Sequence, residues 1–343
     1  MWRYHKIVKR LVESKWTQAY LSITIAQVFV IVALQTIIAV QNTNEQSNID
    51  PITFNAAHTR FLNIKWENMA LIGFQLYLLG MVIDAIAYQN TAEVLVMAVL
   101  NLICAIFGSL EIMDGRKWLG ILQASSINVA PLSIAEKVEI VLTIFLILFA
   151  IGHGVVSHKV SLTFGWNIYK KIGADMQIQR MYRLSQFFVL ALKIDIFTQF
   201  IVSGFYLIQF VPTNLSSSSL WATIFHSIIT FIMLPALYLA RRVLQTEVEW
   251  QMIAFMAWQA IVVIHYGLVL GETSTSNNTW YFWIGIVALG IFVSVITAIL
   301  AFGCMRNFGR GLQPYVQRGS SKRQADIEMD KDIMLDGDWR IDD

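Results

Sequence analysis

Long uninterrupted runs of apolar residues dominate the chain. Eight of them come close to the 20 or so residues that a helix needs to cross the hydrocarbon of a bilayer. The runs are Gln18–Val40, Met69–Tyr88, Val94–Met113, Val138–Ser157, Phe187–Val211, Leu220–Ala240, Met252–Leu270 and Trp280–Phe302. Because they are continuous rather than alternating, they predict helices and not barrel strands. The pattern therefore predicts an all-α, polytopic transmembrane helix bundle with about eight spans.

The polar breaks between these runs differ in length. Long breaks fall at Gln41–Asn68, Asp114–Lys137 and His158–Gln186, whereas only a few residues around Gln89–Ala92 separate the second and third runs. We expect a tight hairpin there. The first run follows a basic stretch, is longer than the apolar part of a cleavable signal peptide, and lacks a small-residue cleavage site after it. It is typical of a retained signal anchor.

Composition supports a membrane protein. The chain is 56% hydrophobic and 14% charged, with a mean hydropathy of +0.58, whereas soluble domains carry about 25% charged residues. A soluble fold this apolar would be unable to cover its own surface. Cys104 and Cys304 both lie in apolar surroundings and indicate neither a disulfide framework nor a metal site.

Positive charge predicts the orientation. With eight spans, the N-terminal segment, the loops after spans four and six, and the C-terminal tail share one side and carry most Lys and Arg residues. These are Arg3, Lys6, Lys9, Arg10, Lys15, Lys159, Lys170, Lys171, Arg180, Arg183, Arg241, Arg242, Arg306, Arg310, Arg318, Lys322, Arg323, Lys331 and Arg340. The opposite side carries only Arg60, Lys65, Arg116, Lys117 and Lys137. The positive-inside rule then places both termini in the cytoplasm, and a bundle of seven spans would break this partition.

Two short loops without Lys or Arg, Pro212–Ser219 and Gly271–Thr279, fall on the lumenal or extracellular side. Each holds an acceptor triplet for N-glycosylation, at Asn214 and at Asn277. Such triplets are also common by chance, and both lie close to the membrane. Two alternatives therefore remain: the two asparagines are glycosylated, or the triplets occur by chance and are not used.

Aromatic residues flank the spans, and we expect them to anchor the helices at the membrane interfaces. They are Trp16, Tyr20, Trp66, Tyr88, Trp118, Trp221, Trp250 and Trp280.

The chain divides into three regions: a basic cytoplasmic N-terminus (1–17), a transmembrane helical domain (18–304) and a cytoplasmic tail (305–343). The end of the tail, Asp326–Asp343, is strongly acidic and has no apolar period. It is typical of a disordered segment. The lipid bilayer is the expected environment, membrane or coat proteins are candidate partners of the tail, and nothing indicates nucleic-acid binding.

Four ionisable residues lie within the spans at a similar depth, near the predicted cytoplasmic side: Asp84, His153, Lys193 and Asp195. Such residues are costly in lipid and are functional candidates. Lys193 and Asp195 are two positions apart and face different sides of a helix, so Asp84–Lys193 and His153–Asp195 are the candidate pairs. Three interpretations remain: a structural charge network, a transport or proton path, and simple placement at the interface, where Lys193 would snorkel.

A second group lies toward the opposite side. We expect Glu111 and Glu139, at span ends, to be solvated, and His226 and His265 to be able to approach each other. Neutral polar residues within the spans are typical of interhelical hydrogen bonds. They are Gln27, Gln35, Gln75, Asn101 and Gln199.

Catalytic motifs are missing from the sequence. It contains no HExxH, no P-loop and no Gly-x-Ser-x-Gly. His153 and His158 superficially resemble one histidine box of a membrane desaturase, but such enzymes need several boxes, and the 6 histidines are scattered. We therefore expect no enzyme activity, no cofactor and no metal.

The most distinctive segment joins spans four and five. It contains Lys170-x-x-Gly173-Ala174-Asp175 and then Lys193-x-Asp195-x-Phe197. Gly173 permits a turn and Asp175 is suited to cap a helix. These motifs, with the number and order of spans over Trp16–Arg310, resemble the uncharacterised fungal multi-pass proteins known as Golgi apparatus membrane proteins. The resemblance implies a location, in the Golgi or related endomembranes, and no activity.

Two main functions follow as expectations. The favoured one is a non-enzymatic scaffold or trafficking component of the Golgi or endomembrane system, with the plasma membrane as the alternative location. The other is a small-solute or proton-coupled transporter or channel that uses Asp84, His153, Lys193 and Asp195. A receptor is the third.

Overall fold

The computed structural model describes residues 10–12, 14–50, 52–125, 128–172, 175–206, 220–274 and 280–312. In these ranges, 8 helices are long and apolar enough to cross a membrane. They are α2 (Lys15–Asn48), α3 (Asn55–Tyr88), α4 (Thr91–Ala124), α5 (Ala130–Ile172), α6 (Met176–Phe205), α8 (Leu220–Thr246), α9 (Glu249–Ser274) and α10 (Tyr281–Met305). Each predicted apolar run maps onto one of them, which confirms the polytopic all-α prediction.

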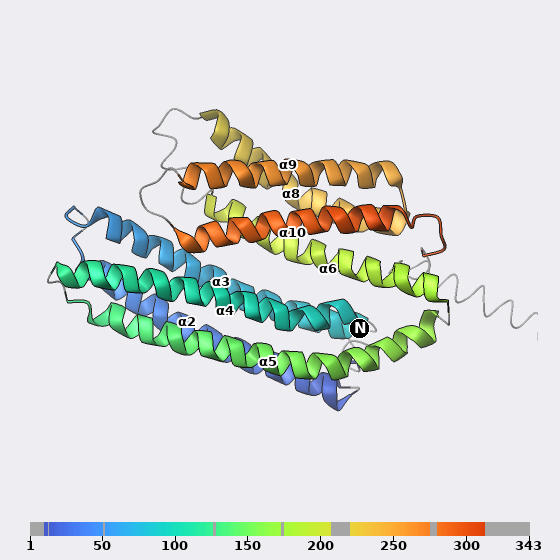
Figure 1. Ribbon diagram of the computed structural model, residues 1–343, viewed down its shortest axis with the longest axis horizontal. Coiled ribbons are helices and arrows are strands. Elements are labelled where there is room, and N and C mark those ends of the chain that lie inside the picture. The colour runs from blue at the N-terminus through green and yellow to red at the C-terminus, as the bar shows by residue number, and fades with distance from the viewer. Residues whose placement is uncertain are drawn as a thin grey trace, which may run out of the picture.

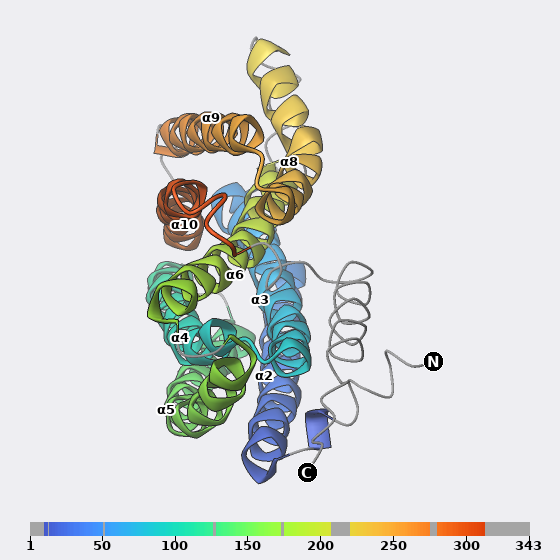
Figure 2. The same cartoon turned by 90° about the vertical axis from the view of Figure 1, so that its right-hand side faces the viewer.

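The helices lie roughly along one long axis (Figure 1). Helices α2 to α5 pack mainly against one another, and α6, α8, α9 and α10 form a second group. Helix α6 lies between the groups, in contact with α3, α4 and α5 on one side and with α8 and α10 on the other (Figure 2). We call the end where α2 leads into α3 the outer end, on the left in Figure 1, and the opposite end the inner end. The charge distribution predicts that the inner end is cytoplasmic.

The outward faces of the helices are apolar. Phe29 on α2 is 74% exposed and Phe231 on α8 is 76% exposed, and many Leu, Ile and Val side chains share these faces. A water-facing surface of this kind would aggregate. The exposed apolar belt therefore fits an environment of lipid chains.

Helices α2 to α5 are longer than a bilayer requires. Helix α4 has 34 residues, or about 51 Å at 1.5 Å per residue, against about 30 Å of hydrocarbon. Much of the predicted breaks Gln41–Asn68 and Asp114–Lys137 is helical for this reason. At the outer end these extensions enclose a core of their own, which we call the outer cap. It consists of Ile49, Ala57, Phe61, Ile64, Trp118, Leu122 and Leu132.

Two local predictions are confirmed. A two-residue link joins α3 to α4, where Gln89 adopts a left-handed conformation (φ 53°) and the Asn90 side chain accepts a hydrogen bond from the Ala92 amide. Asp175 caps α6, because its Oδ1 accepts from the amides of Gln177 and Ile178 at 2.8 and 3.2 Å. These caps satisfy backbone groups that a helix end leaves without partners.

The interfacial belt is only partly as predicted. Trp16 and Trp250 are exposed, but Tyr20, Trp118 and Trp280 are buried inside the bundle. The prediction was wrong for these three residues because neighbouring helices continue past the expected membrane boundary and cover them. The candidate glycosylation residues Asn214 and Asn277, residues 1–9, the turn residue Gly173 and tail residues 313–343 lie outside the described residues.

Candidate functional site: buried polar clusters between the helices

Lys193 on α6 joins three helices near the inner end. Its Nζ donates to Oδ2 of Asp84 on α3 and to Oε1 of Glu93 on α4, the latter at 2.5 Å. The same Glu93 oxygen accepts from Asn90 Nδ2 at 2.7 Å. Lys193 is 13% exposed and Glu93 is 1% exposed. The structure thus brings Asp84 and Lys193 together and adds Glu93, which had been overlooked at the start of a span.

His153 has a different partner from the one expected. Its Nε2 lies 3.0 Å from Oε1 of Gln27 on α2. The Gln27 amide nitrogen donates to Gln75 on α3 and to Asn101 on α4, both at 2.7 Å. These four residues, which we call the central polar cluster, join α2, α3, α4 and α5. The prediction that Gln27, Gln75 and Asn101 connect helices is confirmed.

Asp195 is held within the second helix group. Its Oδ2 accepts from Gln259 Nε2 on α9 at 2.6 Å, and its Oδ1 accepts from Ser294 Oγ on α10 at 3.0 Å. The side chain is fully buried. As far as the described residues show, the expected His153–Asp195 pair is not formed, because depth along the bundle does not determine which helices are neighbours.

Two pockets lie among the described residues, and neither is lined by Asp84, His153, Lys193 or Asp195. An apolar crevice between α3, α4, α6 and α10 is lined by Ile194 and Thr198, on either side of Asp195, but not by Asp195 itself. A polar pocket lies at the outer end, far from the inner network along α3 and α4. His153 and Asp195 are fully buried and Lys193 is 13% exposed, whereas Asp84 is 32% exposed near the inner end.

His226 on α8 and His265 on α9 meet, as the sequence suggested. Their ring centroids are 4.5 Å apart, and the ring of Tyr206 lies 4.3 Å from that of His226. A zinc site needs three or four such ligands. In the part of the chain that the structure describes, no three His, Cys, Asp or Glu side chains are grouped to hold a metal ion.

A second charged cluster, larger than the network around Lys193, was not predicted from the sequence. Near the outer end, Arg60 on α3 donates to Glu67 Oε1 at 2.7 Å and to Asp114 on α4. Trp280, before α10, donates its indole N–H to the same Glu67 oxygen. All four side chains are buried. This arrangement ties the start of α10 to α3 and α4.

Glu111 and Glu139 belong to the same cluster. They are 6% and 5% exposed, so the prediction that they are solvated was wrong. The outer cap covers them because α4 and α5 continue beyond the predicted span ends. One signal for the cluster was present in the sequence: Glu67, Glu111 and Glu139 each lie within two residues of an outer span end, and thus at one depth.

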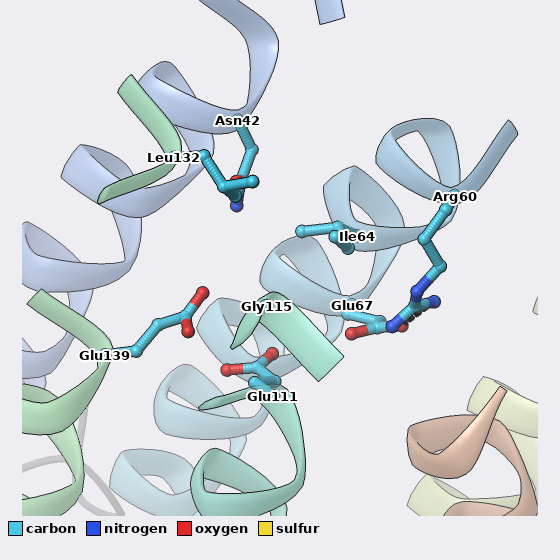
Figure 3. Close-up of a pocket in the computed structure, with 8 residues that line it drawn as sticks. All are labelled: Asn42, Arg60, Ile64, Glu67, Glu111, Gly115, Leu132 and Glu139. Atoms are coloured by element: carbon cyan, nitrogen blue, oxygen red, sulfur yellow. Dashed lines mark hydrogen bonds and ion pairs between the residues drawn. The ribbon is translucent and has the colours of Figure 1, made fainter. Parts of the chain in front are cut away.

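A small pocket lies between these acids. Asn42, Arg60, Ile64, Glu67, Glu111, Gly115, Leu132 and Glu139 line it. Figure 3 shows the Glu111 and Glu139 carboxylates approaching from α4 and α5, with the Asn42 side chain above them and Glu67 beyond Glu111. Gly115 makes room for one of them, since a Cβ on Gly115 would lie 3.3 Å from Glu139 Oε2.

Comparison with known proteins gives one informative match. No family model matches the chain, and no solved structure matches it. The protein named UPF0658 Golgi apparatus membrane protein C23H3.04, from Schizosaccharomyces pombe, is 27% identical over 173 residues. The match covers 47% of this chain and 46% of that relative, so the chain spans less than half of the relative's length.

This match supports the resemblance drawn from the Lys-x-x-Gly-Ala-Asp and Lys-x-Asp-x-Phe motifs. The name of that relative gives a location and no reaction. With its 8 helices long and apolar enough to cross a membrane, the chain has the build of a multi-pass integral membrane protein and is similar to an uncharacterised fungal Golgi apparatus membrane protein.

Proposed function

We propose that the chain is a non-enzymatic component of the Golgi membrane, a scaffold or trafficking factor that acts through partner proteins. One observation carries the proposal: the charges within the bundle are closed into contacts between helices. Lys193 is shared by Asp84 and Glu93, and Asp195 is held by Gln259 and Ser294. Groups bonded in this way fix the positions of helices.

A transporter needs charged groups that face water or a solute. It also commonly has broken helices whose ends meet at the middle of the membrane. Helix α6 runs without interruption past Lys193, while Asp84 lies in the last turn of α3 and Glu93 in the first turn of α4, near the inner end rather than at the middle of a broken helix. Pro235 lies inside α8, in a segment remote from those three side chains in the chain. These features favour a rigid bundle over a gated path.

The inner end offers surface for partners. Helix α5 continues through His158–Ile172, about 22 Å beyond its predicted span at 1.5 Å per residue. Leu162 is 60% exposed and Trp166 is 59% exposed on this extension. Apolar side chains on a projecting helix are suited to contact another protein.

The test is complementation in cells that lack the protein, with the position of Golgi-resident enzymes as the readout. The variant Asp84→Asn/Glu93→Gln/Lys193→Met removes the charges but keeps the side-chain volumes. We expect it to restore the normal position of the Golgi-resident enzymes. The variant Leu162→Asp/Trp166→Asp should reach the Golgi, fail to complement, and lose proteins that cross-link to the unaltered chain. The proposal fails if the neutral variant is stable and Golgi-located yet inactive, because the charges would then serve transport.

A further inference from the structure

The outer cluster holds more acid than its buried arginine neutralises. Three glutamates and Arg60 are among the residues that line the pocket. Arg60 is shared by Glu67 and Asp114, and the described residues form no ion pair with Glu111 or Glu139. Burial of two uncompensated carboxylates is costly unless a cation or protons neutralise them.

Unpartnered oxygens face the space between these acids. Neither Glu111 oxygen makes a hydrogen bond of normal geometry within the described chain, although Gln35 lies beside it. Glu139 Oε2 and both polar atoms of the Asn42 amide are likewise without a partner there. Asn42 is 2% exposed. Buried polar atoms normally find a partner, so this set indicates a missing one.

The size and chemistry of the space limit that partner. It leaves room for a water-sized body, which excludes an organic cation with a carbon chain. Its donors are carboxylate and amide oxygens, the ligands of hard cations, and it contains no sulfur or imidazole. Because no three acidic, His or Cys side chains converge in the described part of the chain, Asn42 and water would have to complete the coordination.

We propose that the pocket at the outer end binds one hard divalent cation, of the Ca²⁺, Mg²⁺ or Mn²⁺ class, through Glu111, Glu139 and the Asn42 amide oxygen. The cation joins α2, α4 and α5 just beneath the outer cap. Gly115 contributes to the site because it has no side chain, and a Cβ at this position would crowd the Glu139 carboxylate. The proposal is independent of the scaffold function.

The test uses the purified full chain in detergent micelles. CaCl₂, MgCl₂ and MnCl₂ are titrated at constant ionic strength, with binding measured by calorimetry and unfolding followed in parallel. We expect saturable binding of at least one of them near one ion per chain and a rise in the unfolding temperature. Glu139→Gln and Gly115→Ala should weaken binding by about 10-fold to 100-fold.

Two matched variants serve as controls. Glu136→Gln lies on the same helix as Glu139 but removes a carboxylate that pairs with the exposed Arg116. Gly120→Ala lies on the same helix as Gly115 and has nothing within 4 Å of the added Cβ. Both should bind the cation as the unaltered chain does.

Three results would overturn the proposal. The first is that the unaltered chain shows no saturable binding, a result that does not depend on whether any variant folds. The second is equal binding by Glu139→Gln and Glu136→Gln. The third is stabilisation by acidification but by none of the three cations, since protons would then neutralise the acids.

Discussion

Glu93 and Lys193 lie one hundred positions apart in the chain, yet the carboxylate Oε1 and the ammonium Nζ are separated by 2.5 Å. The contact joins α4 to α6, and thus the first helix group to the second. Asp84 on α3 shares the same nitrogen. Lys193 therefore helps to fix the relative position of the two groups near the inner end, together with the hydrogen bond from Thr91 on α4 to Gln186 on α6.

Replacement of that lysine should destabilise the bundle. Lys193→Met leaves Glu93 buried without a cation, and loss of one partner of a buried ion pair costs about 3 kcal/mol or more. Thermal unfolding in detergent measures the loss. Lys159→Met, an exposed position on α5, should leave the unfolding temperature unchanged. Equal stability of the two variants would show that the network contributes nothing.

The central polar cluster should respond in a similar way. Gln27→Leu keeps the side-chain volume but leaves Gln75, Asn101 and His153 without their shared partner. A buried polar group without a partner costs about 1–3 kcal/mol. Gln123→Leu, at an exposed position on α4, is the control. A Gln27→Leu chain as stable as this control would contradict the assigned contacts.

Close packing of α9 against α10 depends on Gly290. A Cβ at this position would lie 2.9 Å from Cε2 of Tyr266, whose ring is fully buried and unable to move aside. Gly290→Ala should therefore destabilise the chain by about 1–3 kcal/mol. Gly267→Ala on α9 meets nothing within 4 Å and should be neutral or slightly stabilising. We expect the Gly290→Ala chain to unfold at a lower temperature than the Gly267→Ala chain, and the reverse order would contradict the close contact.

Hydropathy alone was enough to predict the eight helices, because lipid allows a long apolar run no other backbone structure. It did not reveal how far α2 to α5 extend. The outer cap is stabilised by Phe61 and Ile64 against Trp118 and Leu122, contacts between helices that no single run contains. The spacing of Ala57, Phe61 and Ile64 was the available signal, since it places them on one helical face.

Depth in the membrane predicted which charges meet in one case and failed in another. Asp84 and Lys193 lie at one depth on neighbouring helices, so they pair. His153 and Asp195 also share a depth, but His153 faces α2 and Asp195 faces α9 and α10, where each contacts neutral polar residues instead. The pairing requires the order of helices around the bundle, which hydropathy does not contain.

The orientation follows from charge and stays a prediction. Reporter fusions after Asp343 and in the loop at Ser216 should report opposite sides of the membrane, with the C-terminal reporter in the cytoplasm. If both reporters lie on one side, the number of spans between them is wrong. An N-glycan on Asn214 would independently place that loop in the lumen.

The central claim is that the charges within the bundle are structural and that Asp195 is enclosed by protein. Ser294→Cys tests it most directly, because the Ser294 Oγ lies 3.0 Å from Asp195 Oδ1 and the side chain is fully buried. Cys104 and Cys304, both buried, are first replaced by Ala, and Ser47→Cys at an exposed outer position is the reference. A charged thiol reagent added to opened membranes should modify the Ser47→Cys chain and leave the Ser294→Cys chain unmodified. Modification of both at comparable rates would show a water path to Asp195 and would contradict the structural role.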